Sequence, residues 1–99
     1  MYKVIISPLA KQDIKDAAHW YNDKQAGLGK RFTNHIRLKL DSLKKNPYIA
    51  ANRYDEVRTA VLDTFPFMAH YIIDEDKKMI ILLAALHTSL SPDVWKKAR

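Results

Sequence analysis

Hydrophobic positions along the chain repeat first every two residues, then every three to four, and finally every two again. Residues 2–7 alternate loosely and are rich in β-branched side chains, which predicts a strand. Ser7-Pro8 is typical of a helix start, because serine caps a helix and proline suits its first position. Apolar residues then recur at helical spacing as far as Tyr21. We expect this helix to end near Gln25, with Gly27 in a left-handed turn.

A second amphipathic helix is predicted from Leu28 to Lys44. Its apolar residues fall on one stripe: Leu28, Phe32, Ile36, Leu40 and Leu43. Asn46-Pro47 should end it, since proline cannot continue a helix. Two such helices joined by a short glycine turn predict an antiparallel helical hairpin.

The rest of the chain is predicted to form strands and a short terminal helix. The strands are Glu56–Asp63, Phe67–Asp74 and Met79–His87, with a turn at Glu75-Asp76-Lys77 between the last two. Ser91-Pro92 again indicates a helix start, which predicts a basic helix over Asp93–Arg99. The order β-α-α-β-β-β-α is that of an α+β fold, an antiparallel-rich sheet with an α-helical hairpin packed on one face.

Composition indicates a single domain over residues 1–99 with 47% apolar residues and two glycines. The lack of cysteine excludes disulfides, thiolate metal sites and cysteine nucleophiles. The first residues hold too short an apolar run for a signal peptide. The longest later run, Met79–Leu86, is far below the ~20 residues of a membrane span. We therefore expect a cytoplasmic protein without a membrane partner.

The charge balance is basic, with 17 Lys and Arg against 11 Asp and Glu and a net charge of +6. Such a balance favours a polyanionic partner, either nucleic acid or an acidic protein. A basic surface without a partner is the alternative.

A series of short motifs runs through most of the chain. They are Trp20-Tyr21, Gly27-Leu28-Gly29, Phe32, Asn46-Pro47, Val57-Arg58, Phe65-Pro66-Phe67, Tyr71, Leu86-His87, Pro92 and Trp95. In this order and at these intervals they resemble the RelE/ParE superfamily of toxins. The resemblance implies the same order of elements and a toxin held inactive by a partly disordered antitoxin, encoded by the adjacent gene. That antitoxin is expected to be acidic, and operator DNA would be bound only through it.

Two activities occur in the superfamily: RelE-like toxins cut mRNA on the ribosome, and ParE-like toxins poison DNA gyrase. Metal-free RNA cleavage needs a base, an acid and cations around the phosphate. The positions that the resemblance assigns to the basic and tyrosine residues of the nucleases hold Thr59, Val61, Met68, Thr88 and Val94 or Trp95. We therefore expect a ParE-like gyrase poison that is not an enzyme. A RelE-like ribosome-dependent mRNA endonuclease is the alternative.

Two residues remain as weak catalytic candidates, His87 and Arg58. Histidine transfers protons near neutral pH, but His87 could instead close the sheet through a hydrogen bond to a neighbouring backbone group. Arg58 could grip a phosphate or an antitoxin carboxylate, or form a plain surface ion pair. The expected partner-binding residues are Arg53, Arg58, His70, His87 and Trp95.

The spacing of the remaining residue types favours no cofactor. The four histidines include no pair at metal-ligand spacing on one helix face, and no glycine loop could cradle a phosphate. We expect no metal and no cofactor, and we expect Trp20, Tyr21 and Phe32 to be packing residues.

Overall fold

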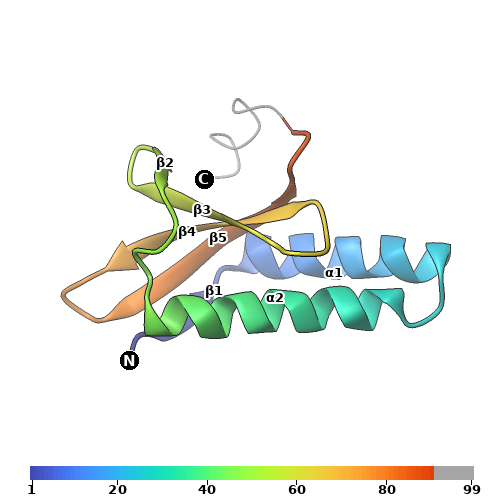
Figure 1. Cartoon of the computed structure of the whole chain (residues 1–99), viewed down its shortest axis with the longest axis horizontal. Helices are drawn as coiled ribbons and strands as arrows, with labels where there is room; N and C mark the ends of the chain where they lie inside the picture. The colour runs from blue at the N-terminus through green and yellow to red at the C-terminus, as the bar shows by residue number, and fades with distance from the viewer. Residues whose placement is uncertain (91–99) are drawn as a thin grey trace.

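Five strands and two helices form two layers in the computed structural model, which describes residues 1–90 (Figure 1). In chain order the elements are β1 (Lys3–Ile6), α1 (Pro8–Lys24), α2 (Leu28–Lys45), β2 (Asn52–Tyr54), β3 (Val57–Val61), β4 (Phe67–Asp74) and β5 (Met79–His87). The sheet order is β1-β5-β4-β3-β2, with β1 parallel to β5 and the other pairs antiparallel. The helices lie side by side on one sheet face (Figure 1).

The α+β class and the helical hairpin on one sheet face are confirmed, and each expected element up to β5 has a counterpart. One strand was not predicted: β2, whose three residues have two exposed side chains and pair with β3 through a register shift. So short a strand carries no alternating apolar pattern, and its pairing with β3 defines it. The terminal helix expected over Asp93–Arg99 lies outside the described residues.

Ser7 joins the end of β1 to the start of α1. Its side-chain oxygen accepts a hydrogen bond from the Ala10 N–H at 3.1 Å, as an N-cap does. The same hydroxyl donates to the Leu83 carbonyl at 3.1 Å, and the Ser7 N–H donates to the Leu82 carbonyl at 3.0 Å. The start of the helix is thereby tied to β5, the strand beside β1 in the sheet.

The two helices lie close together at Gly29. A Cβ atom there would lie 2.3 Å from the Ala18 carbonyl oxygen and 2.8 Å from the Asn22 side chain. The Gly29 N–H donates to Asn22 Oδ1 at 2.7 Å, which satisfies a free donor at the start of α2. Gly27, in the turn before it, has a φ of +86°, in the left-handed region predicted for it.

The core lies between the helices and the sheet and contains a cluster of aromatic rings. Tyr21 and Phe32 pack against Phe65 and Phe67, with ring centroids 4.9 to 6.1 Å apart. Both of the predicted packing residues Tyr21 and Phe32 are therefore confirmed. The buried Tyr71 hydroxyl donates to the Pro47 carbonyl at 2.7 Å and fixes the segment after α2.

The strands separate their side chains between two faces. On β4, Ala69, Tyr71 and Ile73 belong to the core under the helices. Met68 and His70 alternate with them and face the other way, and both are buried. Among the described residues, no helix is long and apolar enough to cross a membrane.

Replacing Gly29 with alanine should destabilise the protein, because the new methyl group meets the Ala18 carbonyl oxygen, a backbone atom that cannot move aside as a flexible side chain can. We expect a loss of about 1–3 kcal/mol in the free energy of unfolding, the usual cost of overpacking, measured by urea titration. Lys30→Ala, at the exposed neighbouring position, is the control and should change stability by less than ~0.5 kcal/mol. Equal midpoints for the two variants would contradict the tight helix contact.

Candidate functional site

Two of the residues expected to bind a partner, Arg53 and His70, meet on the sheet face opposite the helices. Arg53 Nε donates to Thr59 Oγ1 at 3.1 Å, and Thr59 is paired with His70 across β3 and β4. A 3.2 Å hydrogen bond joins the Tyr54 hydroxyl to His70 Nδ1. The edge strand β2 thus brings an exposed arginine and a half-buried tyrosine onto a buried histidine.

His70 is uncharged at neutral pH. Its side chain has an exposed fraction of 0%. Burial lowers the pKa of His70 to about 4, and the nearby positive charge of Arg53 adds to the effect. This ring therefore supplies neither a cation for a phosphate nor a base titrating near pH 7.

Arg58 points toward the helix side, where it holds the segment after α2. Its Nη1 donates to the Ala50 carbonyl at 2.7 Å, and its guanidinium lies 5.0 Å from the centroid of the Tyr48 ring. These contacts bind the arginine to its own chain. The structure thus favours a packing and hydrogen-bonding role for Arg58 over a grip on phosphate.

His87 lies at the far end of the sheet from Arg58. The Ser89 N–H donates to His87 Nδ1 at 3.1 Å, as expected for a histidine that closes the sheet through a backbone group. Arg58 is paired with Tyr71 and His87 with Phe67, four residues apart on β4, which places them roughly 13 Å apart along the strand. The two weak catalytic candidates therefore do not meet at one phosphate.

The three central strands contain a single Lys or Arg, Arg58. On the face opposite the helices, Thr59 and Met68 are buried and Val61 is exposed without charge. A phosphate lying there would find no cationic side chain on β3, β4 or β5. Within residues 1–90, no group of three or more His, Asp or Glu side chains is placed to hold a metal.

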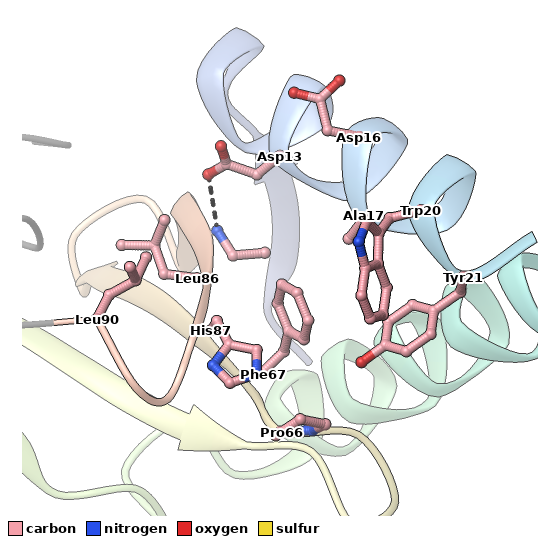
Figure 2. Close-up of a pocket in the computed structure, with 11 residues that line it drawn as sticks. Asp13, Asp16, Ala17, Trp20, Tyr21, Pro66, Phe67, Leu86, His87 and Leu90 are labelled. Carbon is pink, nitrogen blue, oxygen red and sulfur yellow. Dashed lines mark hydrogen bonds between the residues drawn. The ribbon is translucent and has the colours of Figure 1, made fainter. Parts of the chain in front are cut away.

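A groove of about 670 Å³ opens between α1 and the end of β5 (Figure 2). Its apolar and aromatic lining includes Trp20, Tyr21, Phe67, Leu86, His87 and Leu90. Two carboxylates of α1, Asp13 and Asp16, stand at one end. This groove was not predicted from the sequence, because its lining residues come from segments far apart in the chain.

Asp13 closes the edge of β5 inside this groove. Its Oδ2 accepts a hydrogen bond from the Ala85 N–H at 3.0 Å, drawn as the dashed line in Figure 2. Burial raises the pKa of the Asp13 carboxyl, and the hydrogen bond from Ala85 opposes that rise. The Ala85 N–H at this strand edge, which would otherwise lack an acceptor, is thus paired with the Asp13 side chain.

The prediction that Trp20 is a packing residue is wrong, whereas the same prediction is confirmed for its neighbour Tyr21. Its side chain is 56% exposed, and its ring lies edge-on to Tyr21 at 5.1 Å. Asp13, Asp16 and Trp20 follow one another at spacings of three and four on one helix face. That spacing is the sequence signal that could have indicated a surface here. Trp95, expected to bind a partner, lies outside the described residues.

Comparison with known proteins gives a family match and similar folds. The family model described as "ParE toxin of type II toxin-antitoxin system, parDE" matches residues 4–91. The solved chromosomal ParDE system of P. aeruginosa contains a chain similar at a TM-score of 0.78 and 19% identity, covering 90% of this chain and 98% of that one.

Two E. coli structures are also similar. For the intact RelBE toxin–antitoxin complex the TM-score is 0.69 at 13% identity, covering 92% of this chain and 100% of that one. For the isolated RelE toxin the TM-score is 0.67 at 14% identity, covering 99% of this chain and 95% of that one. At these identities the likeness shows the fold alone. The comparison with curated protein sequences found no match.

Folding stability should fall as the pH decreases from 6.5 toward 4, in part because of His70. The unfolded chain takes up a proton at the ordinary histidine pKa near 6.5, whereas the folded chain resists it down to about 4. Protonation therefore favours the unfolded state across this window. Urea titrations at pH 7.0 and 5.0 should show a smaller loss of stability for His70→Gln than for the wild type. Equal losses would contradict the buried neutral histidine.

Proposed function

The chain belongs to the ParE toxin family of type II toxin–antitoxin systems, and we propose that it inhibits growth by binding and poisoning DNA gyrase and not by cutting mRNA. One observation carries the choice of target. The strands that would form a nuclease site, β3, β4 and β5, contain a single Lys or Arg, which is Arg58. The guanidinium of Arg58 donates to the Ala50 carbonyl of the same chain.

The transition state of RNA cleavage concentrates negative charge on a phosphate, and catalysis without a metal needs preorganised cations there. On the face opposite the helices, Met68 and His70 offer a thioether and a neutral imidazole, and the guanidinium beside them, that of Arg53, belongs to the edge strand β2 and is bonded to Thr59. Such a face suits contact with a protein surface better than it suits phosphate chemistry. The proposal therefore rests on binding: the toxin acts by holding its target.

An antitoxin partner fits the same chain. The similar solved chains come from ParDE and RelBE toxin–antitoxin systems, and the net charge of +6 favours an acidic protein. We place part of that interface at the Arg53 cluster, defined as Arg53, Tyr54, Thr59 and His70. There His70 supports Tyr54, and Arg53 presents its guanidinium on the edge strand β2. Operator DNA would be bound by the complex through the antitoxin.

Purified toxin, freed of its antitoxin, should inhibit supercoiling of relaxed plasmid by gyrase or stabilise gyrase-cleaved DNA. Adding an excess of the antitoxin encoded by the adjacent gene should restore supercoiling, which controls for contaminating inhibitors. If saturating toxin neither inhibits supercoiling nor stabilises cleaved DNA, gyrase is not the target.

The same preparation should leave mRNA on translating ribosomes intact. Codon-positioned cuts that His87→Ala removes, and that the exposed control His19→Ala keeps, would establish the endonuclease alternative.

Charge reversal at Arg53 should weaken the antitoxin complex, because the guanidinium would be replaced by a carboxylate facing an acidic partner. We expect Arg53→Glu to raise the Kd of the antitoxin about 10-fold or more, measured by calorimetry at fixed salt. Lys77→Glu, in the exposed turn between β4 and β5, makes the same charge change elsewhere and should alter the Kd little. An unchanged Kd for Arg53→Glu would remove the Arg53 cluster from the interface.

A further inference from the structure

The groove between α1 and β5 reverses the charge of the rest of the molecule. The chain carries a net +6, yet the charged side chains that line the groove are the carboxylates Asp13 and Asp16. Asp13 is half-buried and engaged with Ala85, whereas Asp16 is exposed and accepts a hydrogen bond from Gln12 at 2.8 Å. The outward-facing charge is therefore that of Asp16.

An aromatic surface lies next to this carboxylate. Trp20 stands one helical turn after Asp16 and lines the groove with Phe67 and Leu86 (Figure 2). Its ring already holds a cation, because Lys24 Nζ lies 5.0 Å from the ring centroid. Tryptophan is enriched among the residues that contribute most of the binding energy at protein interfaces, and Trp20 is exposed beside this groove.

The groove exists because β1 is short. β1 pairs with β5 as far as Leu82, and from there the edge of β5 has α1 and not a strand beside it. Because Asp13 occupies the Ala85 N–H, an added strand would have to displace it. The groove therefore suits side chains inserted from a partner surface better than an extended strand.

We propose that this groove is the contact surface for the target, and that it receives a Lys or Arg side chain flanked by large apolar side chains from the DNA-handling enzyme. An enzyme that holds DNA carries Lys and Arg on its working surfaces. The negative carboxylate of Asp16 attracts such cationic side chains and repels an acidic antitoxin. The inference rests on the proposed function and names the residues that perform it, Asp16 and Trp20.

Two substitutions test the groove in the supercoiling assay with the full-length toxin. Trp20→Ala should raise the half-inhibitory toxin concentration about 30-fold, as expected for a central aromatic contact. Asp16→Lys should raise it about 10-fold. Antitoxin affinity should be unchanged for both. Matched controls are Leu38→Ala, at a 60% exposed position of α2, and Asp76→Lys, in the β4–β5 turn; both should inhibit like the wild type.

Each outcome has a distinct meaning. If the wild type inhibits gyrase and both groove variants inhibit equally well, the groove is not the target surface, although the proposed function stands. If the variants lose antitoxin affinity and keep gyrase inhibition, the groove belongs to the antitoxin and the inference is wrong. If the wild type leaves gyrase unaffected, the proposed function itself fails. Asp16 is exposed, so Asp16→Lys keeps the test valid even if Trp20→Ala folds poorly.

Discussion

The hydroxyl of Ser7 is the contact on which the arrangement of the sheet and helices depends. It accepts from the first turn of α1 and donates to the Leu83 carbonyl of β5. The chain must therefore leave the sheet at this residue and turn onto its face. β1 cannot extend along the rest of β5, and the second half of β5 is left beside a helix. Both the helical layer and the groove at Trp20 follow from that early turn.

The two ends of the sheet are chemically different. At one end, β2 lays the exposed Arg53 and the half-buried Tyr54 over the buried, neutral His70. At the other, α1 supplies the carboxylate of Asp16 beside the exposed ring of Trp20. Under the proposed function, surfaces of opposite charge separate the two partners, because each partner is repelled from the other's site.

Local patterns predicted the helices and the long strands, since the capping at Ser7, the left-handed Gly27 and the alternation along β4 are properties of neighbouring residues. β2 was missed because pairing, and not its own sequence, makes it a strand. The site was predicted less well. His87 and Arg58 suggested chemistry as residue types, but only the register shows that they lie on opposite sides of β4 and four residues apart along it. Trp20 was expected to pack because it stands beside Tyr21 near the junction of the two helices, but nearness to the junction does not fix which way a side chain points, and the Trp20 ring is exposed.

The parallel pairing of β1 with β5 has a consequence for synthesis. The first strand, Lys3–Ile6, finds its partner in residues 79–82, so this edge pairing joins segments 76 residues apart in the sequence. Contacts of such long separation form late, because most of the loop between them must be closed first. A nascent chain still inside the ribosome tunnel cannot complete this sheet. The sheet is therefore completed only after both helices and the strands β2, β3 and β4 have been made, so the helical hairpin exists as a chain segment well before the sheet that it covers.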